Sequence, residues 1–269
     1  MGQNEVLQWA ADADRERVIA LEGGVNFRDL GGYRTASGGR VRWGRVYRSA
    51  ALHRLTPADV TTVDQLGLRV VYDLRTDREL ELAPSILPDG VRVERLPIDG
   101  KAAKITDLTD LIVAGKLADV SPDFLERTYE AMAEASASTF GHLLTRLAQA
   151  DGTPALFHCA AGKDRTGMSA VLLLSALGVD EATILDDYEL SSVHFTDRQM
   201  AKLRLKLADV GMDLERYNAV FGVSRDAMAT MLAALRERYG SVERYLREEC
   251  GVGDDIVAAL RARLVQSPG

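Results

Sequence analysis

The chain has 269 residues, 46% of them hydrophobic, which is enough to build a substantial core in one large domain. Its net charge of −7 argues against a surface that binds nucleic acid or anionic membranes. Any site that binds phosphate must therefore be a small, locally positive region of an acidic protein. Two cysteines do not make a disulfide framework, and four dispersed histidines do not make a metal site. Without an apolar run of membrane-spanning length or an apolar signal core, we expect a cytoplasmic protein, with export lacking a cleaved signal as the open alternative.

Strands and helices alternate through the first two thirds of the chain. A helix is expected over 56–67, with Thr56 as its N-cap and Gly67 at its end, and a short polar helix over 77–83. The strands expected in this part lie at 45–49, 68–74 and 91–98, the last nearer the edge of a sheet. The stretch 99–122 has the weakest pattern, and we interpret it as a variable insertion.

The second half of the chain is dominated by helical patterns. Helical spacing over 123–150 is interrupted near 136–141, and an apolar strand at 153–159 leads into a buried helix over 164–179. From 180 onward the chain is almost continuously helical. This order predicts an α/β fold in which helices flank a central, mostly parallel sheet, within one domain spanning 1–269.

The stretch "FHCAAGKDRTG" at 157–167 lies between that strand and that helix. A helix that starts near Arg165 points its free N–H groups and its positive dipole end into the turn. The turn residues are small, so several N–H groups can converge on one anion; they are Ala160, Ala161 and Gly162. Arg165 can hold two phosphate oxygens in a bidentate fork, and Cys159 lies at the base of this positive turn, where a thiolate is favoured.

Three other classes of site match this turn less well. A nucleotide-binding P-loop requires Ser or Thr after Gly-Lys, but Asp164 follows Lys163 here. A thioredoxin-type site requires a second cysteine, and a rhodanese-like sulfurtransferase does not require an arginine at this spacing. A buried structural cysteine is the remaining alternative, and the Arg-Thr-Gly that follows Cys159 favours catalysis over it. Cys250, which precedes a glycine at an expected helix end, is interpreted as an inert packing residue.

The sequence "HCAAGKDRTG" resembles the H-C-x-x-G-x-x-R-[ST]-G signature of cysteine-dependent protein phosphatases. Its G-K-D-R core is similar to the bacterial tyrosine phosphatase B branch, which includes tyrosine, dual-specificity and phosphoinositide phosphatases. Three further stretches resemble that branch: "NFRDLGG" at 26–32, "DLRTDREL" at 73–80 and "YGSVERYLREECG" at 239–251. The resemblance extends from about Gly24 to Leu264.

The resemblance implies a role for each residue of the loop. Cys159 is the expected nucleophile that becomes a phosphocysteine, and Arg165 the expected phosphate clamp. Thr166 is expected to ease departure of the thiolate, and His158 to orient the loop through a hydrogen bond to its backbone. No metal or other cofactor is implied. The remaining loop positions are expected to bind the substrate phosphate: Ala160, Ala161, Gly162, Lys163 and Gly167.

Several assignments leave two interpretations open. Lys163 either contacts highly charged phosphate substrates or is a solvated surface charge. Phe27 and Arg28 either approach the active site as substrate-binding residues, or Phe27 belongs to the core and Arg28 pairs with Asp29 or another carboxylate. The stretch 195–221 is expected to form a helical lid on resemblance alone, with ordinary helix packing as the alternative. The carboxylates of "DDYEL" at 186–190 are interpreted as a helix surface.

A general acid must protonate the leaving oxygen. Asp164, rigidly attached to the loop, is preferred, because the G-K-D-R branch uses its loop aspartate this way. Asp73 is the second candidate and a candidate substrate-binding residue, although it could instead pair with Arg75 or Arg78. The expected partner is a phosphotyrosine-containing protein, with a phosphoinositide or inositol phosphate as the alternative substrate and a non-catalytic phosphate-binding module as the alternative function. No nucleic-acid partner is expected, and oligomeric state is not indicated.

Overall fold

The computed structural model describes residues 17–98, 121, 123–193 and 222–267. Its centre is a five-stranded sheet with the order β1-β3-β6-β4-β5, in which β1 is antiparallel to β3 and all other neighbours are parallel. The strands are β1 (Arg28–Asp29), β3 (Val46–Ser49), β4 (Val70–Asp73), β5 (Arg92–Arg95) and β6 (Ala155–His158). The mostly parallel sheet expected from the sequence is therefore confirmed.

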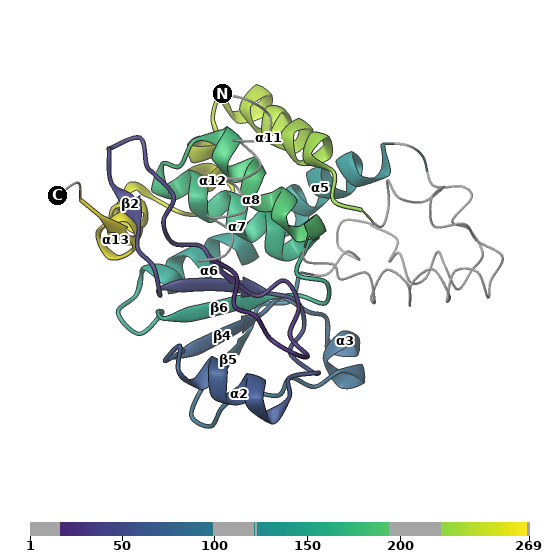
Figure 1. Ribbon diagram of the computed structural model, residues 1–269. Helices are drawn as coiled ribbons and strands as arrows, with labels where there is room; N and C mark the ends of the chain where they lie inside the picture. The colour runs from purple at the N-terminus through teal and green to yellow at the C-terminus, as the bar shows by residue number, and fades with distance from the viewer. Residues whose placement is uncertain (1–16, 99–120, 122, 194–221, 268–269) are drawn as a thin grey trace, which may run out of the picture.

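Helices cover both faces of the sheet (Figure 1). One face carries the larger helical layer, made of α5 (Phe124–Ala135), α6 (Ala137–Ala148), α7 (Asp164–Leu177), α8 (Glu181–Val193), α11 (Arg225–Tyr239), α12 (Val242–Glu248) and α13 (Asp254–Leu264). The other face carries α2 (Pro57–Asp64), and α3 (Asp77–Leu82) follows the end of β4. A small ribbon of β2 (Arg40–Val41) and β7 (Val265–Gln266) joins the first part of the chain to its end.

Alternating strand residues divide the core into two clusters. Val70, Tyr72 and Phe157 pack with the larger helical layer. Val71 and Leu156 point to the other face, where they pack with Val63 of α2. This alternation is the two-residue period of a strand that is buried on both sides. The central strands are thus held rigidly, and the loops at their ends have a fixed base.

Most expected elements are present, with a few corrections. Thr56 accepts a hydrogen bond from Asp59 N in a capping box, as its sequence position predicted. The helical interruption expected near 136–141 is confined to Ser136, and Gly141 lies inside α6. The sequence interpretation missed β1 and the ribbon of β2 and β7, whose strands are only two residues long.

Two sequence expectations fall on residues that lie outside the described ranges. They are the variable insertion over 99–122, of which only position 121 is described, and the lid over 195–221. Among the helices that are described, none is both long and apolar enough to cross a membrane.

Candidate active site

The loop at 158–164 leaves the sheet at the carboxyl end of its central strand. Cys159 directly follows β6, and α7 begins at Asp164. Strands β3 and β4 run parallel to β6 on either side, so their carboxyl ends meet at the same edge. Binding sites of open α/β sheets form at this edge. The fold therefore places the loop where chemistry is expected.

Gly162 shapes the loop around the cysteine. It has a φ of +70°, and its N–H donates to Cys159 Sγ over 3.3 Å. A Cβ at this position would lie 2.5 Å from both Ala50 N and Ser49 O, so only glycine fits. The carbonyl of Gly162 points the other way and accepts hydrogen bonds from Asn26 and Arg48, at 2.8 and 3.0 Å. The turn is thus fixed with an N–H group directed at the sulfur.

The other groups of the loop complete a site for an anion. The first turn of α7 leaves N–H groups without intrahelical partners. Ala160 is exposed and Ala161 half-buried, so this side of the loop is open. Thr166 Oγ1 is buried and has no hydrogen-bond partner within the described ranges. Cys159 itself is only 2% exposed, so its sulfur lies beneath the surface of the loop.

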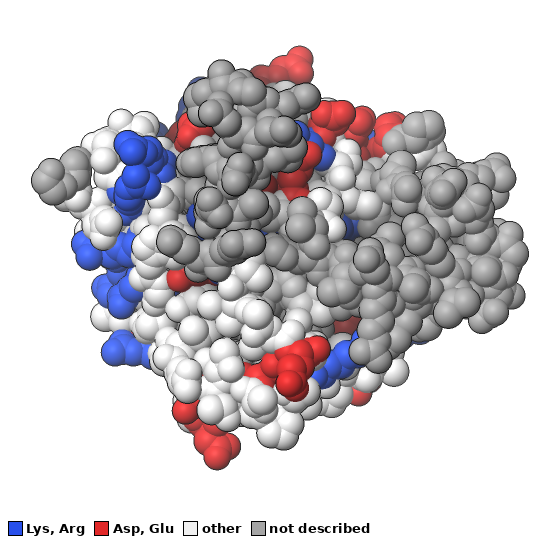
Figure 2. Space-filling view, in the orientation of Figure 1, with Lys and Arg blue, Asp and Glu red and all other residues white. Residues whose placement is uncertain are grey.

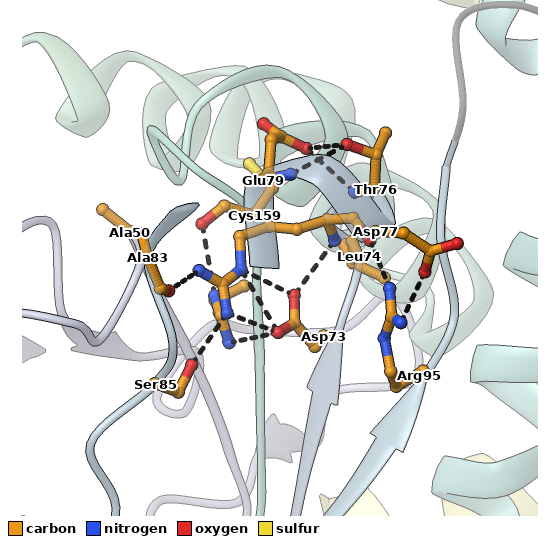
Figure 3. Close-up of polar contacts among 12 residues, drawn as sticks. Ala50, Asp73, Leu74, Thr76, Asp77, Glu79, Ala83, Ser85, Arg95 and Cys159 are labelled. Carbon is orange, nitrogen blue, oxygen red and sulfur yellow. Dashed lines mark hydrogen bonds and ion pairs between the residues drawn. The ribbon is translucent and has the colours of Figure 1, made fainter. Parts of the chain in front are cut away.

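Arg165 is held by a carboxylate that the sequence interpretation missed. Its two terminal nitrogens donate to the two carboxylate oxygens of Glu79, each over 2.6 Å. Burial alone would lower the pKa of Arg165, but the Glu79 hydrogen bonds reverse this and raise it. Glu79 also accepts from Thr76 N in the capping box of α3 (Figure 3). The fork of Arg165 is therefore bound to a rigid helix start.

Glu79 belongs to the stretch "DLRTDREL", so the sequence did contain a signal. A clamp arginine that must hold one orientation requires a carboxylate partner nearby. Glu79 thus serves both as the capping residue of α3 and as the partner of Arg165.

A buried charge cluster supports the loop from behind. Asp187 of α8 pairs with Arg28 of β1 at 3.1 Å and with Arg48 of β3 at 2.7 Å, and Ser191 hydrogen-bonds to both arginines. Burial and the positive charge of Arg28 lower the pKa of Arg48 to about 10, and the two arginines hold the pKa of Asp187 well below its usual value despite burial. Since Arg48 also donates to Gly162 O, this cluster fixes the turn around Cys159.

This cluster corrects the interpretation of "DDYEL" as a helix surface. Asp186 is exposed, but Asp187 is 1% exposed and is the central acid of the cluster. The available signal was the need of Arg28 and Arg48 for an acidic partner once both lay on buried strands.

Phe27 and Arg28 lie behind the loop. Phe27 is 2% exposed and packs in the smaller core cluster with Tyr47 and Leu52. Arg28 has no exposed surface and binds Asp187. Burial of both side chains argues against direct contact with a substrate. The geometry therefore favours the interpretation of Phe27 as a core residue. It favours pairing with a carboxylate, here Asp187, for Arg28.

His158 and Asp73 form a second buried group beneath the loop. His158 Nδ1 lies 3.2 Å from Cys159 O, as expected for a residue that orients the backbone, and Nε2 lies 3.7 Å from Asp73 Oδ2. Burial lowers the pKa of His158 to about 4, so the ring is neutral near pH 7. Asp73 is bound by Arg75 through its Nη2 at 2.7 Å and its backbone N at 3.0 Å (Figure 3).

Burial would raise the pKa of Asp73, but the hydrogen bonds from Arg75 lower it. The carboxylate is thus ionised and 1% exposed, neither of which suits a proton donor or a substrate contact.

Asp164 faces a pair of tyrosines from two distant helices. Tyr129 of α5 donates to Asp164 Oδ1 over 2.6 Å, and its oxygen lies 2.6 Å from that of Tyr188 in α8. The Asp164 side chain keeps about a third of its surface exposed, at 31%. The tyrosine pair thus holds one carboxylate oxygen and leaves the other, Oδ2, for further contacts.

Lys163 and Gly167 lie on either side of Arg165 and Thr166 in the sequence, and Lys163 Nζ lies 3.5 Å from Asp164 Oδ1. Lys163 is 4% exposed and donates from Nζ to Gly222 O over 2.7 Å, so it is not the solvated surface charge of the alternative interpretation. A Cβ on Gly167 would lie 2.9 Å from the ring of Tyr188, which accounts for a glycine here.

In the described ranges, no group of three or more His, Cys, Asp or Glu side chains could hold a metal ion.

A strand–loop–helix unit with a cysteine at the base of an anion-binding turn and an arginine six positions later defines a cysteine-dependent phosphatase. A sequence profile described as "Tyrosine phosphatase family" matches residues 19–266. The chain therefore belongs to the tyrosine phosphatase family and is an enzyme of that class, as the resemblance implied.

Two curated relatives match over most of their length. The chain is 29% identical to a triple specificity protein phosphatase, PtpB of Mycobacterium tuberculosis, covering 92% of this chain and 99% of the relative. It is 32% identical to a tyrosine-protein phosphatase of Nostoc commune, covering 82% of this chain and 74% of the relative. Among solved structures, TpbA of P. aeruginosa aligns with a TM-score of 0.35 and 18% identity, covering 78% of this chain and 88% of that one.

Proposed function

We propose that this phosphatase hydrolyses phosphotyrosine through a phosphocysteine intermediate, with Cys159 as the nucleophile. The observation that carries the proposal is the placement of Cys159 Sγ, which receives the Gly162 N–H at 3.3 Å beside the N-terminus of α7. Both features stabilise a negative sulfur and a bound phosphate. Phosphorylated substrates follow from the family itself.

The first step forms a bond between Cys159 Sγ and phosphorus while the bond from phosphorus to the leaving oxygen breaks. The loop N–H groups and Arg165 take up the negative charge of the equatorial oxygens. Glu79 accepts hydrogen bonds from the two terminal nitrogens of Arg165 but not from its Nε. The guanidinium plane is therefore held in one orientation before the substrate arrives. In the second step water displaces the thiolate, and the buried Thr166 hydroxyl, which has no hydrogen-bond partner among the described residues, is the proposed donor to it.

Asp164 is the proposed general acid that protonates the leaving oxygen. It is on the loop and 31% exposed, with Lys163 Nζ 3.5 Å from its Oδ1, whereas Asp73 is 1% exposed and bound by Arg75 at 2.7 Å. Tyr129 acts as a positioning residue, because its hydroxyl fixes one oxygen of Asp164. In the second step Asp164 accepts the proton of the attacking water, which restores the acid.

The proposed substrate range follows from the burial of Cys159. A thiol that is 2% exposed is reached more easily by the long aryl phosphate of phosphotyrosine than by the short side chain of phosphoserine. The buried charge of Lys163 beside the loop supports the alternative of a phosphoinositide or inositol phosphate substrate. We also propose that the chain forms a single domain, that residues 195–221 form a lid and that the protein is cytoplasmic.

A substrate panel with two variants tests this proposal. Initial rates are measured in EDTA on a phosphotyrosine peptide, a phosphothreonine peptide and a phosphoinositide, and we expect the phosphotyrosine peptide to react fastest. Asp164→Asn and Asp73→Asn are then compared on aryl phosphates with a poor and a good leaving group.

Asp164→Asn should lose about 100-fold or more on the poor leaving group and little on the good one, as expected for loss of a general acid. Asp73→Asn should lose activity equally on both, because it disturbs the loop and not the proton transfer. The assignment is wrong if Asp73→Asn alone shows the dependence on the leaving group, and a strict requirement for metal ions contradicts the phosphocysteine route.

A further inference from the structure

A hollow of about 410 Å³ lies at the edge of the sheet opposite the catalytic loop. It is lined by Arg42, Trp43, Arg45, Arg263 and Gln266. Arg45 directly precedes β3, whereas Cys159 directly follows β6, the parallel neighbour of β3. Four strand residues at roughly 3.3 Å each separate the two edges, so the hollow is about 13 Å or more from the catalytic loop.

Within the described part of the chain, the arginines of this hollow have no acidic partner. Several exposed or half-buried arginines on other faces do form ion pairs, as in Arg92–Asp151, Arg225–Asp186, Arg236–Glu181, Arg244–Glu248 and Arg247–Asp254, although others such as Arg54 and Arg69 form none there. Arg42, Arg45 and Arg263 form none with any carboxylate in the described part of the chain, and their contacts are to carbonyl and hydroxyl oxygens. Figure 2 shows Lys and Arg gathered along this side of the molecule, over β2 and α13.

Each of these arginines is anchored through part of its guanidinium. Arg42 and Arg263 each donate Nε to a main-chain carbonyl over 3.1 Å, which leaves their terminal nitrogens. Arg45 donates Nη2 to a threonine hydroxyl over 3.1 Å, and its Nε is buried without a hydrogen-bond partner among the described residues. Capping of a helix end accounts for the Nε contact of Arg263 but not for the presence of three arginines around one hollow. Anchored side chains lose little conformational entropy when they bind a ligand.

Trp43 forms a rigid wall of the hollow. Its side chain is 43% exposed, yet it packs closely on Gly31 and Gly32 of the "NFRDLGG" stretch. A Cβ on Gly32 would lie 2.2 Å from the indole, and one on Gly31 would lie 2.5 Å from Trp43 Cα. The Arg17 guanidinium lies 5.1 Å from the indole centroid and steadies the ring further. The two glycines thus hold an exposed aromatic ring among the arginines.

We propose that this hollow is a second anion-binding site, for a compact ligand with two or more phosphate groups. Guanidinium forks match phosphate oxygens in geometry and charge. The volume of about 410 Å³ falls in the range of roughly 300–1,000 Å³ typical of small-molecule sites. The chain as a whole carries a net charge of −7, so nonspecific attraction does not account for such binding. The site does not depend on the proposed phosphatase reaction.

Binding of tripolyphosphate tests the proposal, in 0.15 M salt chosen to screen weak surface attraction. Saturating vanadate occupies the catalytic loop during the titration, so only a second site is measured. A Trp9→Phe background leaves Trp43 as the single tryptophan of the chain, and its fluorescence reports on the hollow. We expect saturable binding by calorimetry together with a change in Trp43 emission.

Arg42→Ala and Arg263→Ala should each weaken this binding by about tenfold or more, because each removes charge-assisted hydrogen bonds. Arg244→Ala is the matched control, since it removes one exposed arginine that is paired with Glu248 on α12. It should change the affinity less than twofold. Absence of saturable binding, or equal weakening in all three variants, would overturn the proposal.

Activity on a small aryl phosphate shows that the variants are folded and separates this proposal from the catalytic one. The source of the ligand is distinguished with vesicles that contain phosphatidylinositol bisphosphate, compared with soluble inositol hexakisphosphate. Capture by such vesicles that is lost in Arg42→Ala assigns the phosphate groups to a lipid headgroup. Competition by the soluble compound alone assigns them to a free metabolite. Failure of both compounds to displace tripolyphosphate in the wild-type protein contradicts a site of this class.

Discussion

The two cysteines of this chain are buried in two turns that differ in the direction of the adjoining helix. Cys159 precedes α7, and Cys250 follows the end of α12. Each turn contains a glycine with a φ of +70°, Gly162 and Gly251, and both sulfurs are nearly inaccessible. Cys159 therefore faces helix N–H groups, whereas Cys250 lies beside the last carbonyls of its helix.

The neighbours of the two thiols reinforce this difference. Burial raises the pKa of Cys250 to about 11, and the charge of Glu249 adds to the increase. Cys159 instead receives the Gly162 N–H and has the guanidinium of Arg165 near the loop. Burial alone does not distinguish a structural cysteine from a nucleophile. The orientation of the backbone and the sign of the nearest charge do.

The largest expected effect comes from removing each thiol in turn. Cys159→Ser should abolish turnover of an aryl phosphate while retaining vanadate binding, because the N–H groups of the loop remain. Cys250→Ser should keep turnover within about threefold of the wild type, since that thiol contacts Tyr245 and lies outside the catalytic loop. Initial rates and vanadate titrations on both purified variants measure the contrast. Near wild-type turnover by Cys159→Ser would remove the basis for treating the two turns as chemically different.

The second-largest expected effect concerns Arg165, a positively charged residue near the Cys159 loop. Arg165→Lys keeps a charge but loses the two-pronged fork and the paired contact with Glu79. We expect a loss of about 2–4 kcal/mol in transition-state stabilisation, which is roughly 30- to 1,000-fold in kcat/KM. Arg244→Lys, on the helix that precedes Cys250, is the control and should change kcat/KM less than twofold. A loss below about tenfold in Arg165→Lys contradicts the clamp assignment.

The sequence predicted the catalytic turn well because its chemistry is local. The eleven residues 157–167 contain the end of a strand, three small residues, a helix start and an arginine six positions after Cys159. The same holds for α2, whose N-cap Thr56 and following proline form a continuous signal. Local signals of this kind need no knowledge of the tertiary structure.

The supports of that turn could not be predicted in the same way, because they come from distant parts of the chain. Asp187 meets Arg28 across 159 positions, and Glu79 meets Arg165 across 86. Tyr129 looked like an ordinary helical core residue, and only packing of α5 beside α8 brings its hydroxyl to Asp164. Strands of two residues, such as β1 and β2, carry no periodicity at all.

The smallest expected effect concerns the residue that precedes each cysteine, which is neutral His158 in one turn and Glu249 in the other. Burial holds the pKa of His158 at about 4, below its usual value near 6.5, so folding favours the uncharged ring. The resulting stability is present above about pH 6.5 and is lost as the pH falls toward 4, where the unfolded chain binds the extra proton. Asp73, whose pKa is lowered, loses its contribution only below that window.

His158→Gln should therefore flatten the dependence of the unfolding free energy on pH between 6.5 and 4. The shift corresponds to at most about 3 kcal/mol across this window. Urea unfolding at several pH values measures it, and His142→Gln is the control because His142 is exposed on the surface of α6. The wild type and the His142 variant should lose stability in parallel as the pH falls, while the His158 variant loses less. Parallel curves for all three proteins would mean that the turn of Cys159 tolerates a charged histidine, and its neutrality would then no longer distinguish it from the turn of Cys250.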